Sequence, residues 1–451
     1  MADTAIESAN KIFKYLQDSD TIMKSSVNRI ETIESTLSIP SSTSTSFSNT
    51  VKTANKTYTI SKVYDLNNKT VTLPANVVLV FKVGGGLKNG TIIGTNSVIE
   101  ASHKIFSNVN VQGTWKCVGN VLWFADGCNI VENNGVCYVQ NKVDASADIQ
   151  YALDSAFREL VFPPVPYYIA NTIVLHKEKK LVLQGSKMKL AMEQCSPTIK
   201  DTAILFTDKN ICILSISLNE CTYQNTVIIE GGNFDTSSCS SYTSNCIQVL
   251  ADASQKIWGL IINTNIKGKF NNTGGVGINI NPIAKQTSEY AGTNKAYVTE
   301  IRINSTISDF GIGVKATNYM NESTGTYYNW CTDIVIDGSI VNCPLCVDTN
   351  ADCDIKAMLQ AGYYWNTKQN GQALVRFSGI RGSMSSNIYD ICGGGGPYSQ
   401  QYALETTHAS CKMVPYGMFN SFLIEARWTG QPVIKGILYN NKTEQINSSV
   451  A

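Results

Sequence analysis

Six acidic residues lie on or near segments where apolar residues alternate, as they do in β-strands. Glycoside hydrolysis needs two carboxyl groups about 5 to 9.5 Å apart across the scissile bond. Neighbouring strands could bring two acids together, but one outward acid per strand is also the usual solvation of a β surface. No catalytic residue is therefore assigned from the sequence. The six acids are Glu230, Asp235, Glu300, Asp309, Asp333 and Asp337.

Two aromatic clusters are better candidates for a binding role. They are Tyr327, Tyr328 and Trp330, with Asn329 among them, and then Tyr363, Tyr364 and Trp365. We expect both clusters in loops, where exposed rings stack on sugars and the amide of an Asn bonds to hydroxyls. The alternative is that the rings pack between strands or between subunits.

Cysteines and histidines give no firm sign of a metal site or a cofactor. The 14 cysteines are scattered, and reduced thiols acting as small core residues explain them. Cys343 and Cys346 form the one CxxC pair, and no second pair stands at a spacing that suits zinc. We expect no metal and no cofactor. The Gly-rich run at 392–398 lacks the Lys-Ser/Thr pair of a phosphate-binding loop.

The composition argues against several partners. Charged residues make up 16% of the 451 residues, and the net charge is +1. No electrostatic field draws such a chain to nucleic acid, and we expect none to bind. The chain has neither an N-terminal signal peptide pattern nor an apolar run of about 20 residues, so no membrane insertion is expected.

Residues 6–37 are predicted to form one helix. Its apolar residues follow an alternating three-four spacing, which is a heptad seam that Asp20 and Glu34 interrupt. An amphipathic helix packed on its own domain and a coiled coil between identical chains both fit, and we favour the coiled coil. Its oligomerisation residues are Ile6, Ala9, Phe13, Leu16, Met23, Val27, Ile30 and Leu37.

From Tyr58 onward the chain is β in character. Short alternating strands end at Gly, Asn or Pro, with no helix between them, as in the run from Thr70 to Phe106. One helix interrupts this pattern near 148–157, where Asp148 is the expected N-cap and Ile149, Ala152, Leu153 and Ala156 share a face. Because an open β stack exposes unpaired backbone at its end, we expect this helix to cap the stack.

After the helix, similar strand-corner-strand phrases recur at roughly 20 to 35 residues, a period typical of solenoids. Since the unit consists of strands, the fold class predicted is all-β, a parallel β-helix with apolar side chains inside. The segment 418–438 looks like an antiparallel hairpin or small β unit that closes the far end.

Two stretches resemble known families. DIQYALDSAFRELVFPPVPYYIANTIVLHKEKKLVLQGS is similar to the opening motif of pectate-lyase-like right-handed β-helix proteins, D-x-x-x-x-I-Q-x-A followed by Pro-Pro-Gly and Tyr-x-Ile. Val165 and Pro166 stand where the Gly is expected. This resemblance implies the fold, and it implies no particular activity.

The second stretch, LPANVVLVFKVGGGLKNGTIIGTNSVIEA with IFSNVNVQGTW, resembles tail-fibre and tailspike proteins of phages and prophages of gut Bacteroides-like bacteria. That resemblance implies a homotrimeric virion protein, assembled in the bacterial host cytoplasm and located in the tail. The implied partners are copies of itself, other tail proteins bound through the N-terminal helix, and bacterial surface polysaccharide.

These observations give one expected organisation. A helical stalk for tail attachment (1–39) and a Ser/Thr-rich linker (40–57) precede an N-terminal β region (58–139). A right-handed parallel β-helix (140–385) and a C-terminal β cap (386–451) follow. The expected function is host-surface glycan adhesion or fibre scaffolding. The alternatives are a polysaccharide depolymerase, acting as hydrolase or lyase on the same fold, and a tail-to-fibre adaptor that binds no glycan.

Overall fold

The computed structural model is mostly β and forms two compact units, 1–117 and 118–451, which are treated separately. The division falls earlier than the boundary placed after residue 139 from the sequence. The predicted helix at 6–37, with its oligomerisation residues, lies outside the described residues. These are 47–133, 136–185, 201–218, 227–251, 256–269, 274–280, 296–321, 326–361, 373–378, 381–385, 388–390, 402–406, 412–416, 418–420, 424–428, 437–438 and 443–445.

The first unit is a five-stranded sheet in which every strand pairing is parallel. Strand β4 pairs with β2 through its first part and with β3 through its last part, so this long strand joins the two pairings into one sheet. The elements are α2 (Phe47–Thr50), β1 (Thr57–Ile60), β2 (Val63–Thr72), β3 (Val78–Phe81), β4 (Gly86–Glu100) and β5 (Phe106–Trp115).

Asparagines form the corners of this unit. Asn55, Asn76 and Asn96 have φ of 57°, 56° and 52°, the left-handed conformation that Asn tolerates better than most residues. Asn76 Nδ2 donates to Asn55 Oδ1 at 2.9 Å. At another corner Asn108 Nδ2 donates to Asn89 Oδ1 at 3.3 Å. The prediction that Asn marks the corners of stacked strands is confirmed here.

The described part of the Ser/Thr-rich segment 40–57 contributes two buried side chains to the first unit. Phe47, in α2, is 2% exposed, and its ring lies 5.6 Å from that of Tyr64 on β2. Val51 is buried as well. These two apolar side chains explain the difference from the predicted linker, because they pack against the sheet.

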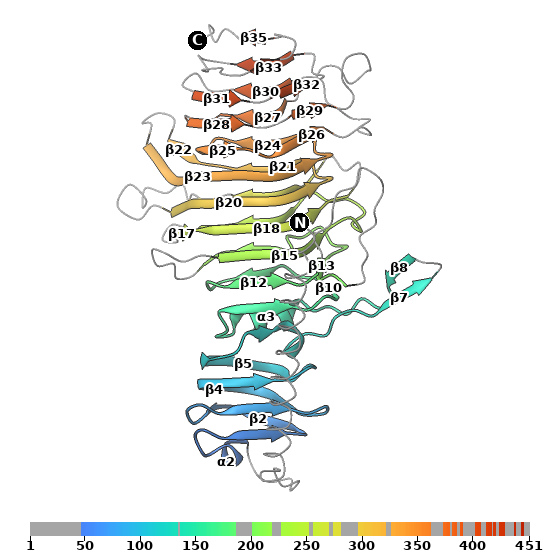
Figure 1. The fold of residues 1–451 in the computed structure, drawn as a ribbon, viewed down its shortest axis with the longest axis vertical. Coiled ribbons are helices and arrows are strands. Elements are labelled where there is room, and N and C mark those ends of the chain that lie inside the picture. The colour runs from blue at the N-terminus through green and yellow to red at the C-terminus, as the bar shows by residue number, and fades with distance from the viewer. Residues whose placement is uncertain are drawn as a thin grey trace, which may run out of the picture. The chain divides into compact units, whose positions relative to one another are not determined.

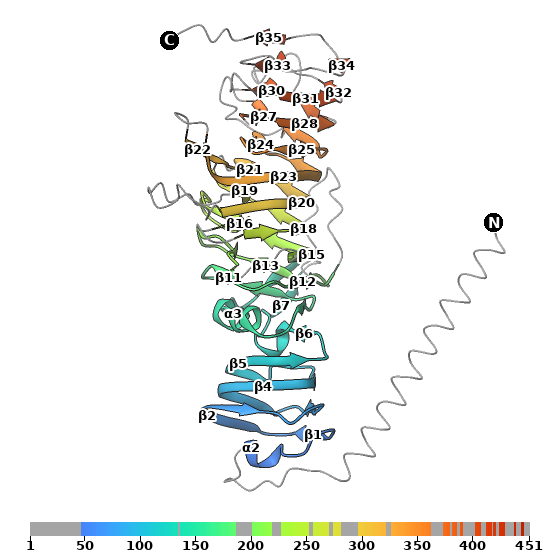
Figure 2. The ribbon, with the colours of Figure 1, turned by 90° about the vertical axis from the view of Figure 1, so that its left-hand side faces the viewer.

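Among its described residues, the second unit contains a ten-stranded sheet and an 18-stranded sheet, in which the strand pairings given by the register are parallel apart from the β22–β23 pair. The chain passes from one sheet to the other and back, and each pass stacks on the previous one (Figures 1 and 2). We call one such pass a rung. This arrangement is consistent with a parallel β-helix.

The ten-stranded sheet comprises β11 (Ile173–Leu175), β14 (Leu214–Ile216), β16 (Asn245–Val249), β19 (Val276–Ile280), β21 (Ile312–Ala316), β24 (Leu345–Thr349), β27 (Ala373–Phe377), β30 (Tyr402–Thr406), β33 (Ile424–Trp428) and β35 (Thr443–Gln445).

The 18-stranded sheet comprises β6 (Gly119–Asn120), β9 (Glu159–Phe162), β10 (Pro166–Tyr168), β12 (Lys180–Leu183), β13 (Ile204–Phe206), β15 (Val227–Asp235), β17 (Lys256–Trp258), β18 (Leu260–Lys267), β20 (Ala296–Ser308), β22 (Tyr319–Asn321), β23 (Thr326–Val341), β25 (Cys353–Ile355), β26 (Met358–Ala361), β28 (Arg381–Ser385), β29 (Ile388–Asp390), β31 (Lys412–Tyr416), β32 (Met418–Asn420) and β34 (Ile437–Leu438). Outside these sheets lie the 3-10 turn η1 (Val121–Trp123), the hairpin β7 (Ile130–Asn133) and β8 (Val136–Val139), and helix α3 (Ser146–Asp154).

Aliphatic columns fill the interior of the second unit. One column of register partners in the ten-stranded sheet contains Leu214, Ile247, Ile278, Val314 and Val347, each at most 1% exposed. Each buried aliphatic side chain contributes roughly 1.5–3 kcal/mol relative to exposure. The alternating strands of the sequence therefore place their apolar side chains inside, as predicted.

Helix α3 covers the first edge of the ten-stranded sheet. Its buried face includes Ile149, Ala152 and Leu153, as predicted, whereas Ala156, predicted on the same face, lies beyond the end of the helix at Asp154. Gln150 replaces a missing strand: its Nε2 donates to Val174 O at 2.9 Å, and its Oε1 accepts from Val174 N at 2.8 Å. The side-chain amide thus satisfies edge backbone that would otherwise stay unpaired.

Asp144, rather than Asp148, organises the start of α3. Its Oδ1 accepts hydrogen bonds from the backbone N of Ser146 at 2.9 Å and of Ala170 at 3.2 Å, while no side chain caps the helix at Ala145. Asp148 lies inside the first turn, so its prediction as N-cap was wrong.

The segment at 418–438 does not form the antiparallel hairpin that its turn residues suggested. Strand β32 pairs in parallel with β29, β33 pairs in parallel with β30, and β34 pairs in parallel with β32. Each strand finds its partner in the preceding rung, so parallel stacking prevails over the local turn signal.

We expect Gln150→Ala to lower the free energy of unfolding by about 1–3 kcal/mol, because it leaves Val174 N and O without their partners. Chemical denaturation followed by circular dichroism measures the change. The exposed Gln140 provides the control, and Gln140→Ala should stay within about 0.5 kcal/mol of the parent. Equal stability of the two variants would contradict the capping role of Gln150.

Candidate functional site

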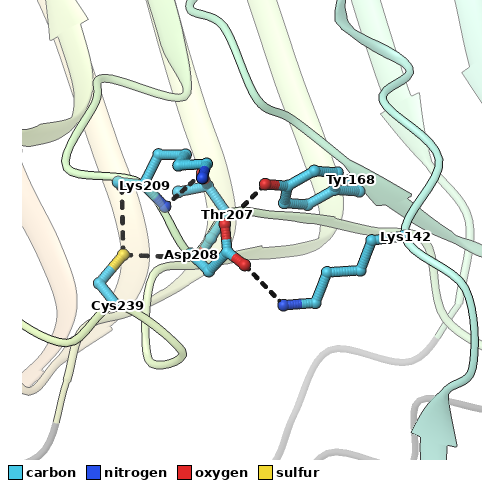
Figure 3. A network of polar contacts seen from close by, with 6 residues as sticks. All are labelled: Lys142, Tyr168, Thr207, Asp208, Lys209 and Cys239. Atoms are coloured by element: carbon cyan, nitrogen blue, oxygen red, sulfur yellow. Dashed lines mark hydrogen bonds and ion pairs between the residues drawn. The ribbon is translucent and has the colours of Figure 1, made fainter.

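A network of charged and aromatic side chains gathers around Asp208, just after β13. Tyr168 Oη donates to Asp208 Oδ1 at 2.6 Å, and Lys142 Nζ lies 2.7 Å from Asp208 Oδ2 (Figure 3). The same ammonium lies 5.6 Å from the centroid of the Tyr168 ring. Both carboxylate oxygens therefore have a partner, one neutral and one cationic.

Stacking of β10 on β13 brings this network together. Tyr168 is the register partner of Phe206, two residues before Asp208, and the two rings lie 5.5 Å apart. Cys239 fixes the turn that presents Asp208, because its thiol donates to Thr207 O at 3.5 Å and to Lys209 O at 3.2 Å (Figure 3). Apolar side chains of Cys128 and Ile204 line the buried side of Tyr168.

The charges of this network follow from its contacts. Hydrogen bonds from Lys142 and then from Tyr168 lower the pKa of Asp208 below its usual value. Burial, followed by the bond to Asp208, raises the pKa of Tyr168 to about 12. At neutral pH the carboxylate is ionised and the phenol is a donor. Tyr168 is thus held as a hydrogen-bonding and stacking group, and not as a base.

Four of the six acids considered in the sequence form surface ion pairs, accept local hydrogen bonds or occupy a corner of the backbone. Glu230 lies 3.3 Å from Lys180 Nζ with its side chain 41% exposed. Asp333 Oδ2 accepts from Thr299 Oγ1 at 3.2 Å, and Asp337 Oδ1 accepts from Gly338 N at 2.7 Å. Glu300 stands at a corner with φ of 56°.

Stacking brings two pairs of these acids to neighbouring positions: Glu300 with Asp333 on adjacent strands, and Asp235 with Asp309 two strands apart. Asp235 ends β15, pairs with Lys267 on β18, and Lys267 pairs with Ser308 on β20, directly before Asp309. Two strand spacings separate them, about 10 Å of backbone distance. Side-chain reach can bring such a pair near the roughly 6.5–9.5 Å used by inverting glycosidases.

The carboxyl group of Asp309 lies in a buried environment with two hydrogen-bond donors. The residue is 6% exposed, and burial raises the pKa of its carboxyl group, with a smaller contribution from the charge of Asp235. Ser308 Oγ donates to Oδ2 at 2.9 Å, and Asn342 Nδ2 donates to Oδ1 at 3.3 Å. These donors orient the carboxyl group.

The structure places the first aromatic cluster on a strand instead of a loop. Tyr327, Tyr328 and Trp330 begin β23, and Tyr327 is the antiparallel register partner of Met320 on β22. The strand extends because β22 supplies it with a second edge. Tyr363, Tyr364 and Trp365 lie outside the described residues.

The thiols of the CxxC pair are engaged with backbone. Cys346 Sγ donates to Cys343 O at 3.6 Å, and Cys343 Sγ donates to Val341 O at 3.4 Å. Burial raises the pKa of Cys343 to about 12. Cys346 is fully buried as well, so both residues act as core thiols. Within the described residues, no three His, Cys, Asp or Glu side chains are grouped so that they could hold a metal ion.

No protein-family model matches the chain, and neither does a curated protein or a solved structure. In the part of the chain that the structure describes, no helix is long and apolar enough to cross a membrane.

Sequence reasoning missed the Asp208 network entirely. Lys142 and Asp208 are 66 residues apart, and Tyr168 and Asp208 are 40 apart. The available signal was the run Tyr167-Tyr168-Ile169, which the sequence assigned to a fold motif. In that run Tyr167 is fully buried, while Tyr168 points to the polar network.

We expect Asp208→Asn to destabilise the protein by about 1 kcal/mol at pH 7, a modest value because both charged partners are partly exposed. The native pKa of Asp208 is lowered, so its contribution is present above the unfolded-state value near 4 and is lost as the pH falls through the native value. Denaturation at pH 7 and at pH 3 tests this. The difference between variant and parent should be smaller at pH 3 than at pH 7, whereas Asp201→Asn, at an exposed turn, should show no difference at either pH.

Proposed function

We propose that the chain is a phage tail-fibre or tailspike-like virion protein whose right-handed parallel β-helix adheres to bacterial surface glycan or scaffolds the fibre. One observation carries the proposal: stacked parallel sheets whose first edge is closed by α3. Asp144, Ile149, Gln150 and Ala152 occupy the four positions of the D-x-x-x-x-I-Q-x-A motif, and each has a structural role there.

Glycan adhesion suits the chemistry of the surface. A chain with 16% charged residues relies on Asn, Ser and Thr for its polar surface, and such groups hydrogen-bond to sugar hydroxyls. Tyr327, Tyr328 and Trp330 lie where β23 runs on to pair with β22 (Figure 1). Aromatic rings there would supply faces on which sugars stack.

The proposal includes a homotrimer. The heptad seam at 6–37 would join three chains and attach them to other tail proteins, and the protein would reside in the virion tail after assembly in the host cytoplasm. An adaptor that binds no glycan would use the same architecture.

Purified full-length protein, mixed with surface polysaccharide from a susceptible Bacteroides-type host, should retain the polymer at its original length. Trp330→Ala should weaken retention about tenfold, which corresponds to the loss of one stacked ring. The half-buried Trp258 is the matched control, and Trp258→Ala should retain polymer normally. Polymer that is intact but not retained would contradict adhesion and favour the adaptor.

A second candidate function rests on Asp309. A buried carboxyl group with a raised pKa, two strands from Asp235, is a suitable general acid for a polysaccharide depolymerase. In this reaction Asp309 would protonate the glycosidic oxygen, and Asp235 would activate water on the opposite side of the bond.

If the chain shortens the polymer, Asp309→Asn should slow shortening by about 10²-fold or more while retention persists. Size-exclusion chromatography of the polymer over time gives both values. Asp333→Asn, which alters an acid bonded to threonines, should cleave at the parent rate. Undiminished cleavage by Asp309→Asn would exclude Asp309 as the acid.

A further inference from the structure

One register position repeats along the ten-stranded sheet, and its residues alternate in charge over the later strands. We call these six register partners the charge column: Lys315, Asp348, Arg376, Glu405, Arg427 and Glu444. The sign of the charge changes at every step, from β21 to β35.

The described members of the column lie at the surface of the sheet. Asp348 is partly exposed, whereas its neighbours Val347 and Thr349 are buried. Arg376 Nε lies 3.4 Å from Glu405 Oε2, and the Glu405 side chain is only 13% exposed. At least this pair is in contact, in a setting where water screens the charges incompletely.

The same position is also complementary on the earlier strands, with hydrogen bonds in place of charges. Gln248 Nε2 donates to its register partner Ser215 at 3.1 Å. Asn279, the next partner of Gln248, donates to Asn245 Oδ1 at 3.1 Å, and Asn245 donates to Gln248 Oε1 at 3.1 Å.

One inward column does not distinguish the strands, because its consecutive partners Ile278, Val314, Val347 and Val375 are all aliphatic and fully buried. A strand stacked on the wrong rung would bury almost the same side chains in this column. The other inward column does change in size, through Ile280, Ala316, Thr349 and Phe377. Loop length gives no fixed order either, because the step from Val314 to Val347 is longer than the step from Leu404 to Ala426.

We propose that the charge column sets the order in which the later rungs stack. Skipping one rung would place Lys315 against Arg376, or Asp348 against Glu405, and like charges directly opposite each other are unfavourable. Correct stacking makes residues of opposite charge register partners at every step. The column thereby disfavours rung-skipped structures through charge, whether or not the chain binds glycan.

The test compares refolding of the full chain from denaturant at low and at high salt, and scores native protein by its limited-proteolysis pattern. Arg376→Glu creates three successive acids, and we expect its native yield at low salt to fall at least about threefold. Salt should recover much of that yield, since screening shortens the range of the repulsion. The matched control is Arg302→Glu, at an exposed position whose register partners Ile261 and Val335 carry no charge, and it should refold like the parent.

A second variant decides the outcome if Arg376→Glu fails to fold for another reason. It inverts every member of the charge column, acids to Lys and bases to Glu, and so restores alternation with each sign reversed. We expect its yield to return to near the parent value. Either of two results would overturn the proposal: Arg376→Glu refolds as well as Arg302→Glu, or the fully inverted column refolds no better than Arg376→Glu.

Discussion

Parallel hydrogen bonding of each strand to the strands before and after it is the constraint on which the second unit depends. A strand inside the stack has the backbone groups of both edges hydrogen-bonded to its neighbours. Unpaired N–H and C=O groups therefore remain only at the first and last strands. At the first strand of the ten-stranded sheet the protein uses a side chain, because Gln150 offers β11 the same donor and acceptor pair that a neighbouring peptide would offer. The end of α3 is treated in the same way: Lys177 donates to Asp154 O and Lys179 to Ser155 O.

The features that sequence predicts well here are those decided within a few residues. Asn76 and Asn96 mark corners because their own backbone needs a positive φ, and the buried face of α3 follows from its helical spacing. Contacts and strand pairings between residues on different rungs were not predicted. Nothing near Lys142 indicates Asp208, and the turn residues at 430–432 suggested a hairpin although Met418 and Ile424 each lie on a strand paired with an earlier rung. In a stack, the partner of a strand is one rung away in space but a variable distance away in sequence.

The acids illustrate why residue type alone could not identify a catalytic pair. Glu300 and Asp333 occupy the same corner of adjacent rungs, both with positive φ, and Asp309 and Asn342 do the same at another corner. Each of these residues adopts the positive φ that its corner requires. Asp309 differs from Glu300 and Asp333 in its surroundings, since it is buried beneath donors, whereas Asp333 stays partly solvated. Only the stack gives it that environment, so its chemistry depends on rungs that are far away in sequence.

Stability and specificity are divided between the two faces of the ten-stranded sheet. The inward columns supply apolar burial, and the column through Ile278, Val314 and Val347 is nearly uniform from rung to rung. The outward position distinguishes the rungs, through amides near Gln248 and through charge from Lys315 onward. A solenoid with identical outward residues would have a repeat that is easy to extend. Its outward side chains would not distinguish one rung from the next. In this protein rung length changes along the chain, so a distinct side chain on each rung is the feature that can keep their order.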